Sequence, residues 1–292
     1  MRISTLDIAK LSIVSYFSGI TPLILKNKEI FNALSTMRTN WHLASAVSPT
    51  KFVNYLIKEK IFNKIVFNFP NRREMRFVKG KVDIYQVLST LNNRGYLSHL
   101  TALELNNLSS ERSMQLFWNV EQRKKILNSR INSQDSIDTA FRNKSRTTHN
   151  ICEYNGYMIY GISGMFTDNL GVIEKDNIRY TDLERTLIDI MVRPQYSGGI
   201  INVLKIFGKA KERVRLKKLT EYYKKIKYVY PYHQSIGFYL ERTNYPIEFI
   251  DTFSKIKKRY NFYLDNQIAH PKYSKKWQLY YPSELDKIKD FI

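Results

Sequence analysis

The segment 48–78 carries a pattern that few folds can accommodate, a well-capped amphipathic helix followed at once by two strands. Ser48-Pro49 is a strong helix start, because a serine hydroxyl can cap the first turn and proline is favoured at the first helical position. Apolar residues then recur at helical spacing and predict one inward face: Phe52, Val53, Leu56 and Ile57. The opposite face of this helix is polar.

Two strands are expected directly after this helix. Lys64–Phe69 is β-branched and aromatic, Pro70-Asn71 supplies a turn, and Arg72–Val78 returns, which predicts a β-hairpin. Upstream, the apolar spacing predicts two shorter helices, over Asn27–Ser35 and over Trp41–Ala46 with Asn40 as its cap.

Three short helices and a basic hairpin, in this order, are typical of a winged helix-turn-helix. In that arrangement the third helix enters the major groove of DNA and the hairpin contacts the flanking backbone. The candidate DNA-contacting residues are the outward side chains of the third helix and the basic residues of the hairpin: Thr50, Lys51, Asn54, Tyr55, Lys58, Lys64, Arg72, Arg73 and Arg76. The alternative is a helical knot whose hairpin mediates only protein contacts.

The charge of the chain favours an anionic partner. The 292 residues include 47 Lys and Arg against 26 Asp and Glu, for a net charge of +21, which points to nucleic acid, an acidic membrane face or an acidic protein. The basic residues concentrate in the regions 1–80 and 181–292, on either side of a nearly neutral middle. With 43% hydrophobic residues, the chain can still bury a sizeable core.

The sequence offers no assembled active site. It has no phosphate-cradling loop, no dinucleotide fingerprint and no pair of histidines spaced for zinc, and none of its acidic residues has a lysine two positions later, as restriction-type nucleases usually do. We therefore expect no catalytic residue, no metal and no cofactor. The single cysteine, Cys152, excludes an intrachain disulfide and a cysteine-built zinc site, and it favours a reducing cytoplasm. No membrane span and no export leader are expected.

Three separated segments of the remaining chain resemble the AbiEi family, the antitoxins of type IV toxin–antitoxin systems first met as abortive phage-infection modules. The segments are 96–105 (YLSHLTALEL), 180–199 (from YTDLERTLIDIMVRP to SGG) and 235–242 (SIGFYLER). The resemblance covers about 83–245 and follows a predicted winged helix, where the family carries one. It implies an N-terminal winged helix-turn-helix domain over 1–80, with a leader helix, and a larger α+β antitoxin domain with a basic tail over 81–292.

The resemblance also implies a function. Such proteins are not enzymes. They repress their own operon by binding inverted repeats in promoter DNA, and they counteract a cognate nucleotidyltransferase-like toxin through the C-terminal domain, with or without a stable complex. The long leader 1–25 and the tail 246–292 depart from the compact members of the family.

The pattern of the central segment is structural. Within it, Asp182 is expected to cap a helix over Leu183–Val192, and Glu184, Arg185 and Asp189 are expected to pair within the scaffold. Gly198-Gly199 is expected to make a tight turn. Strands are expected over 116–123, 157–162 and 177–180.

A second basic surface is expected in Lys205–Lys227, which is predicted to be an amphipathic helical segment. Its outer face binds DNA phosphates, binds the toxin or is simply solvated: Lys205, Lys209, Arg213 and Lys217. In the tail, basic residues interleave with aromatic ones, which either stack on single-stranded bases or, as the preferred interpretation, pack against the domain: Tyr260, Phe262, Tyr263 and Tyr273. Two other function classes stay open, a DNA-processing nuclease targeted by a winged helix and a protein-only adaptor. The missing metal-ligand motif argues against the nuclease.

Overall fold

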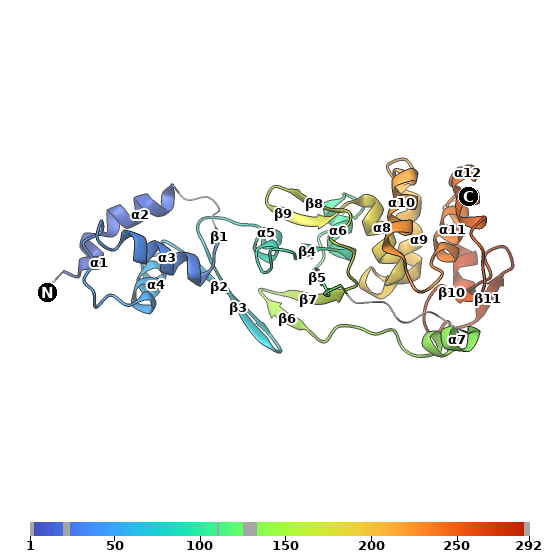
Figure 1. The fold of residues 1–292 in the computed structure, drawn as a ribbon, viewed down its shortest axis with the longest axis horizontal. Coiled ribbons are helices and arrows are strands. Elements are labelled where there is room, and N and C mark those ends of the chain that lie inside the picture. The colour runs from blue at the N-terminus through green and yellow to red at the C-terminus, as the bar shows by residue number, and fades with distance from the viewer. Residues whose placement is uncertain (1–2, 20–23, 110, 125–132, 289–292) are drawn as a thin grey trace. The chain divides into compact units, whose positions relative to one another are not determined.

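The computed structural model describes residues 3–19, 24–109, 111–124 and 133–288, and its fold is mixed α+β (Figure 1). The chain divides into two compact units. Unit 1 comprises Met1–Asn93 with Cys152–Gly156, and unit 2 comprises Arg94–Ile151 with Tyr157–Ile292. The first division therefore falls after Asn93, beyond the boundary at residue 80 that the sequence suggests.

Unit 1 runs helix, helix, strand, helix, helix, strand, strand, helix. Its elements are α1 (Thr5–Ile8), α2 (Lys10–Ser18), β1 (Ile24–Leu25), α3 (Asn27–Met37), α4 (Pro49–Lys58), β2 (Asn63–Phe69), β3 (Arg72–Val78) and α5 (Ile84–Ser89). The strands form one antiparallel sheet in the order β1-β3-β2.

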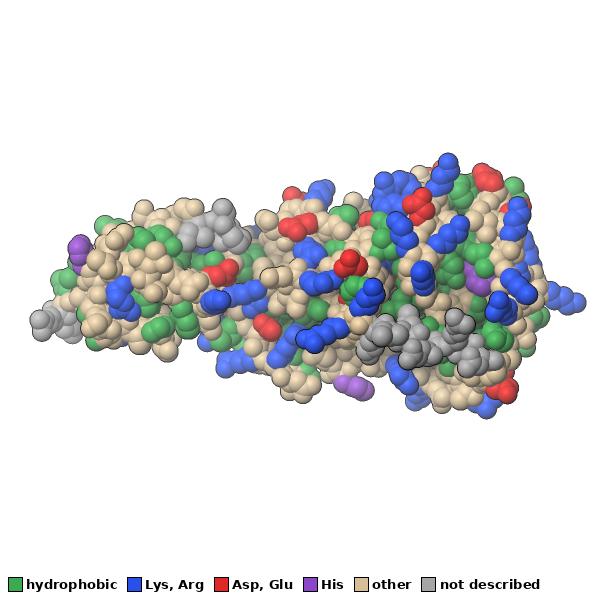
Figure 2. Space-filling model, in the orientation of Figure 1, with side chains coloured by type: hydrophobic (Ala, Val, Ile, Leu, Met, Phe, Trp, Pro, Cys, Tyr) green, Lys and Arg blue, Asp and Glu red, His purple; other side chains and the backbone are tan. Residues whose placement is uncertain are grey.

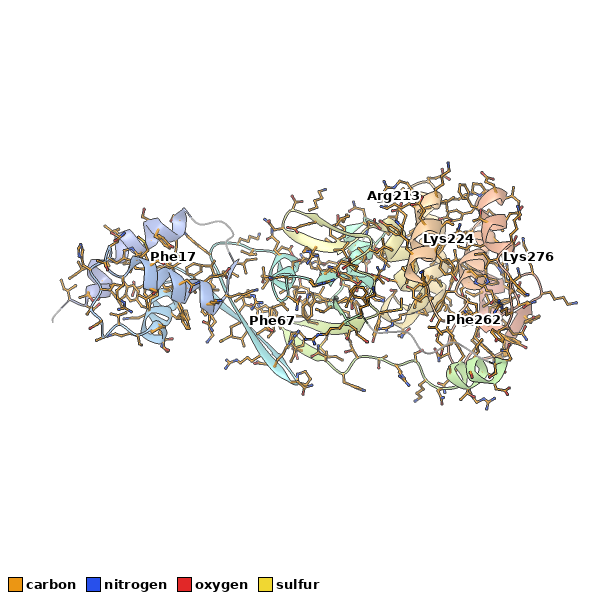
Figure 3. The ribbon with its side chains drawn as sticks, in the orientation of Figure 1. Phe17, Phe67, Arg213, Lys224, Phe262 and Lys276 are labelled. Atoms are coloured by element: carbon orange, nitrogen blue, oxygen red, sulfur yellow. The ribbon has the colours of Figure 1, made fainter. Side chains whose placement is uncertain are left out.

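The core of unit 1 is aromatic and draws on the leader as well as on the later helices. Phe17 of α2 points inward between the helices (Figure 3) and meets Phe62 edge-on at 5.0 Å between ring centroids. Trp41 lies 5.6 Å from Phe52 of α4. All four rings are buried, so the leader belongs to the fold of this unit.

The prediction of a helix over Trp41–Ala46 is wrong. Residues 38–42 and 45–46 form turns, and Trp41 inserts its ring into the core. The guanidinium of Arg38 donates to the carbonyl oxygens of Ala44 and Val47, each at 2.8 Å, and so satisfies loop groups that a helix would pair internally. The unit gains its additional helix from the leader instead.

Unit 2 holds two sheets and most of the helices. Its elements are β4 (Tyr96–Leu97), α6 (His99–Leu105), β5 (Gln115–Glu121), α7 (Gln134–Arg142), β7 (Tyr157–Gly164), β8 (Val172–Lys175), β9 (Ile178–Thr181), α8 (Leu183–Val192), the 3-10 helix Pro194–Tyr196, α9 (Gly199–Ala210), α10 (Leu216–Ile226), α11 (His233–Arg242), α12 (Ile247–Ser254), β10 (Phe262–Tyr263), β11 (Pro271–Ser274), β12 (Leu279–Pro282) and the 3-10 helix Ser283–Lys287. The strand β6 (Ile151–Tyr154) spans the division.

The larger sheet of unit 2 is mixed. Its strands run in the order β7-β5-β4-β9-β8, with β5 parallel to β7, β4 parallel to β9, and the other pairs antiparallel. Helices α6 and α8 pack on each other and on strands of this sheet. The smaller sheet has the order β10-β12-β11. The strands expected near 116–123, 157–162 and 177–180 are confirmed as β5, β7 and β9.

Local helix signals in unit 2 are largely confirmed. Asp182 caps α8 by accepting a hydrogen bond from the Arg185 amide, and the helix has the expected bounds. Gly198 and Gly199 adopt φ of 78° and 81°, as a tight turn before α9 requires.

The tail packs into unit 2 rather than extending from it. Phe262 and Trp277 are fully buried in the same core as α9 and α11, which confirms the packing interpretation for this part of the tail. Tyr273 is exposed and lies against Tyr280 of the adjacent strand β12. Within the described ranges, no helix has the length and apolar content needed to cross a membrane.

Candidate nucleic-acid interface and a polar cavity

The outer face of α4 is polar, as its sequence predicts. Ser48 caps the helix by accepting a hydrogen bond from the Lys51 amide at 3.1 Å, and Pro49 occupies the first turn. The inward residues Phe52 and Leu56 are fully buried. This packing turns four of the predicted DNA-contacting side chains to solvent: Thr50, Lys51, Asn54 and Lys58.

Tyr55 does not belong to that face. Its side chain is buried against the leader, in the same cluster as Leu6, Ala9 and Ile13. Burial, together with the charges of Asp7 and Glu59, raises the pKa of its phenol to about 12. The prediction that Tyr55 contacts DNA is corrected, because the leader helices cover this position.

The hairpin exposes to solvent three of the four basic residues that are predicted to contact DNA. Lys64, Arg72 and Arg73 are exposed, and the register places Arg73 opposite Asn68 and Arg72 opposite Phe69. The guanidinium of Arg72 lies over the Phe69 ring at 5.2 Å and 3.7 Å from a carboxylate oxygen of Glu74. These contacts hold the arginine at the hairpin end, where its charge faces water.

Arg76 is buried and is corrected as well. Only 3% of the residue is exposed. Its guanidinium donates to Thr90 Oγ1 at 2.9 Å, to the Thr90 carbonyl at 2.8 Å and to Glu74 at 3.2 Å. The segment after α5 therefore takes up the side chain, and Arg76 fixes the hairpin instead of contacting a phosphate.

The basic face predicted in 205–227 is divided between two helices. Lys205 and Lys209 are exposed on α9, and Lys217 is exposed on α10. Figure 2 shows Lys and Arg side chains gathered over this part of unit 2. Arg213 lies in the turn between the helices and donates to the carbonyls of Asn106 and Asn107 at 2.6 and 3.1 Å. The prediction of a single basic helical face is therefore wrong. Arg213 instead joins the turn to the end of α6 by hydrogen bonds.

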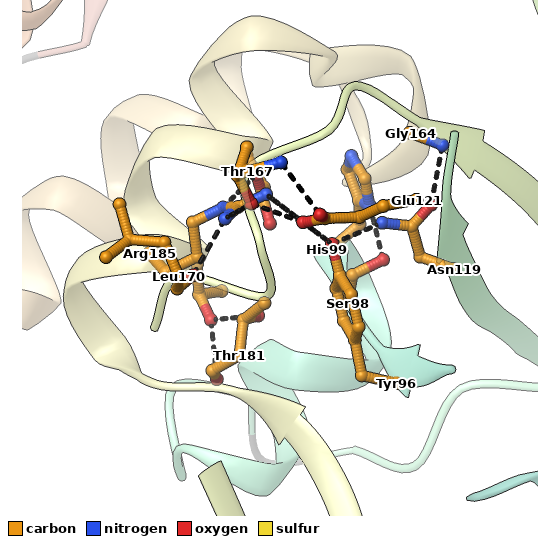
Figure 4. Close-up of polar contacts among 12 residues, drawn as sticks. Tyr96, Ser98, His99, Asn119, Glu121, Gly164, Thr167, Leu170, Thr181 and Arg185 are labelled. Carbon is orange, nitrogen blue, oxygen red and sulfur yellow. Dashed lines mark hydrogen bonds and ion pairs between the residues drawn. The ribbon is translucent and has the colours of Figure 1, made fainter. Parts of the chain in front are cut away.

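The charges of α8 form an internal network, as the sequence suggests. Arg185 is buried and donates to Asp189 at 2.8 Å. It also donates to Thr167 Oγ1 at 2.8 Å and to the Leu170 carbonyl at 2.7 Å (Figure 4). Glu121 lies 3.9 Å from the same guanidinium. Burial raises the pKa of Asp189, and the adjacent arginine opposes that rise.

The same helix contributes a second set of ion pairs at its start. Lys218 of α10 contacts Asp182 at 2.6 Å and Glu184 at 3.1 Å, and Arg215 lies 3.3 Å from Glu184. Glu184 is buried, and the hydrogen bonds from Arg215 and Lys218 lower its pKa against the cost of burial. These carboxylates join α8 to α10, so this end of α8 is scaffold.

A cavity of about 280 Å³ opens beside the Arg185 network. Its wall includes His99, Asn119 and Gly164, and the Asn119 side chain bridges Tyr96 and the Gly164 amide at 2.6 and 3.0 Å (Figure 4). Asp189 also lines the cavity, and its Oδ2 is buried with no hydrogen-bond partner among the described residues. No sequence motif predicts this cavity. The local signal for it is the alternation Tyr228, Tyr230, Tyr232, since all three tyrosines line the cavity.

His99 is held neutral in this wall. Burial, with Arg193 and Arg185 nearby, lowers the pKa of its imidazole to about 3, and Nδ1 shares a 2.8 Å hydrogen bond with Ser98. Its φ of 51° lies in the left-handed region, which is uncommon for a residue with a side chain.

This burial predicts acid sensitivity. His99 and His233 have folded pKa values of about 3 and about 4, against 6.5 in an unfolded chain. The unfolded state therefore binds more protons below pH 6.5, and each histidine is expected to remove up to about 1.4 kcal/mol of stability per pH unit as the pH falls from 6.5 toward 4. Urea unfolding at several pH values measures this loss of stability.

His99→Asn, which tolerates the same φ, should flatten the dependence of stability on pH. The exposed control His270→Asn should leave this dependence unchanged. Equal slopes in the wild type and both variants would contradict the prediction.

No metal site emerges from the part of the chain that the structure describes. No group of three histidine, cysteine, aspartate or glutamate residues gathers there. Cys152 is buried, and burial raises the pKa of its thiol to about 11, which makes it a poor nucleophile at neutral pH.

No protein-family model matches the chain, and no curated protein sequence matches it.

Proposed function

We propose that the protein is a DNA-binding transcriptional regulator whose unit 1 is a winged helix. The observation that carries the proposal is the element order of unit 1, helix, strand, helix, helix, strand, strand, over α2 to β3, with β1 paired to β3. In a winged helix of this order, α4 takes the place of the recognition helix and the β2–β3 hairpin takes the place of the wing.

The exposed side chains fit these two roles. A B-DNA major groove is about 12 Å wide and admits one α-helix, whose exposed polar side chains then reach the base edges. Asn54 and Lys51 lie on the outer face of α4 and carry the donors and acceptors for such contacts. Arg72 and Arg73 at the hairpin end suit phosphates, which position a protein without reading sequence.

The antitoxin part of the proposal rests on the resemblance of three segments in unit 2 to the AbiEi family. On that basis the protein represses its own promoter at inverted repeats and counteracts a nucleotidyltransferase-like toxin without catalysing a reaction. Co-expression with a nucleotidyltransferase encoded beside it, toxic when expressed alone, tests this part; absence of rescue would remove it and leave DNA binding standing.

The DNA-binding part predicts a change in salt dependence. Replacing Lys51, Arg72 and Arg73 by alanine should weaken binding to the promoter of the protein's own operon at every salt concentration. It should also reduce the slope of log K against log salt by roughly 0.9 for each phosphate that the protein no longer neutralises, so by about 2 to 3 in total. Fluorescence anisotropy across a salt series measures both quantities.

The matched control replaces three exposed cations of unit 2 by alanine: Lys175, Lys275 and Lys287. Its net charge equals that of the variant that lacks Lys51, Arg72 and Arg73. Its slope should stay at the wild-type value. A third variant, with Lys205, Lys209 and Lys217 replaced, reports whether the second basic face also lies on the DNA. Equal slopes for the first variant and the control would refute the assigned interface.

A further inference from the structure

Two cavities of unit 2 adjoin each other. The first, of about 280 Å³, is the one beside Arg185, and the second is of about 380 Å³. Val192, Arg193, Tyr230 and Tyr232 line both. Together they fall in the range typical of small-molecule sites, with Arg193 and the two tyrosines at the junction.

The second cavity is cationic. Lys144, Arg146 and Arg193 line it, and Asp265 is the acidic residue among its lining. Within the described residues, none of these three cations has a hydrogen bond or an ion pair from its charged group. They differ in this from Arg185 and Lys218, whose charges are paired inside the scaffold. Three unpaired cations around one hollow favour an anionic group such as a phosphate.

The wall that carries Lys144 and Arg146 is fixed in place. Asn266 donates from Nδ2 to the Ala140 and Asn143 carbonyls at 3.0 and 2.9 Å, and its Oδ1 accepts from Ser145 at 3.0 Å. Two residues beyond Arg146, the Thr148 amide donates to the Tyr196 hydroxyl at 2.7 Å. Hydrogen bonds therefore hold this stretch on both sides of Arg146, so part of the ordering cost of binding an anion is already met.

The first cavity is aromatic and has an unused acceptor. Tyr228, Tyr230 and Tyr232 line it, and the Tyr228 and Tyr232 rings meet edge-on at 5.2 Å. Asp189 Oδ1 accepts from Arg185, whereas Oδ2 is buried and has no partner in the part of the chain that the structure describes; the residue is 8% exposed. An unsatisfied buried acceptor costs free energy that a ligand N–H group would recover. The left-handed backbone of His99 in the same wall is a form of strain that concentrates at functional sites.

We propose that unit 2 binds a nucleoside phosphate, with its base among the tyrosines and Asp189 in the first cavity and its phosphate against Lys144, Arg146 and Arg193 in the second. The base supplies a planar face for the tyrosines and an N–H donor for Asp189. The ligand is either a free nucleotide or the 5′-phosphorylated end of a strand, since both present the same groups. This site is separate from the DNA interface proposed for unit 1, and neither proposal requires the other.

Titration calorimetry with the full chain tests the site. ATP, GTP, CTP and UTP are titrated in turn, with adenosine and inorganic phosphate as partial ligands. At least one nucleotide should bind at least tenfold more tightly than either partial ligand. Lys144→Gln with Arg146→Gln, both in exposed positions, should weaken that nucleotide at least tenfold, whereas Lys205→Gln with Lys209→Gln on α9 should not.

Two further arms separate the parts of the site. Asp189→Asn should weaken nucleotides but not inorganic phosphate; if that variant is unfolded by circular dichroism, Tyr230→Leu serves the same purpose. A 5′-phosphorylated oligonucleotide binding more tightly than both its 5′-hydroxyl form and the free nucleotide assigns the strand end as the source.

No heat from any nucleotide at millimolar concentration would overturn the proposal, as would equal affinity for nucleotide and inorganic phosphate. Unchanged binding in the Lys144 and Arg146 variant would overturn it too. The variant with Lys51, Arg72 and Arg73 replaced should bind nucleotide normally, so failure of this site and failure of the DNA interface are distinguishable.

Discussion

Replacing Arg185 by methionine is expected to lower the free energy of unfolding of unit 2 by about 3–5 kcal/mol. The Arg185 side chain is 5% exposed, and those of Asp189 and Glu121 are 9% and 2% exposed. Methionine fills a similar volume but leaves both carboxylates buried without the guanidinium. It also leaves the Leu170 carbonyl and Thr167 without a donor. Urea unfolding followed by circular dichroism measures the change.

A matched ion pair on the same helix supplies the control. Arg215 contacts buried Glu184, but its own side chain is 70% exposed and Lys218 reaches the same carboxylate. Arg215→Met should therefore destabilise the protein far less than Arg185→Met. In the double variant Arg185→Met with Asp189→Asn, part of the stability should return, because one of the stranded charges goes as well. A similar destabilisation by Arg185→Met and Arg215→Met would show that burial of the first pair does not matter.

Features set by neighbouring residues could be predicted from the sequence. The cap by Ser48, the cap by Asp182 and the bounds of α8 depend on side chains within three residues of the amides that they bind, so a local pattern contains them. The β2–β3 hairpin is similar, because the turn at Pro70-Asn71 sets its register.

Features set by distant segments of the chain could not be predicted from the sequence. The sequence places Tyr55 on the outer face of α4, but α1 and α2 fold over that position. The sequence makes Arg76 a candidate for DNA contact as a basic residue of the hairpin, yet its side chain contacts Thr90, fourteen residues later in the chain. Trp41 lies in an amphipathic stretch, but it serves the core from a turn.

The cavities of unit 2 show the same limit more strongly. Their walls join His99, Asp189 and Tyr230, which lie on separate elements far apart in the chain. Each residue alone fits an ordinary packing role. The alternation of the tyrosines is the local signal, but only the fold brings them beside a carboxylate oxygen and cations that have no partner among the described residues.

Replacing Trp277 is expected to destabilise the protein strongly. The result tests whether the tail is part of the core of unit 2. The ring is fully buried, and its Nε1 donates to Glu241 at 2.6 Å. Its backbone carbonyl accepts from Gln234 at 2.7 Å, and Gly237 of α11 leaves the space that the ring occupies. Trp277→Ala should therefore lower the free energy of unfolding by about 3–5 kcal/mol, since the change opens a large cavity.

A glycine substitution tests the same packing from the other side. A Cβ on Gly237 would lie 2.0 Å from the Trp277 ring, so Gly237→Ala should destabilise the protein even though alanine favours a helix. The control is Tyr273→Ala, because Tyr273 is 41% exposed. It should cost far less than Trp277→Ala in urea unfolding followed by circular dichroism. If Trp277→Ala and Tyr273→Ala were equally mild, the tail would not be part of the core, and its aromatic residues would regain their interpretation as a surface for single-stranded bases.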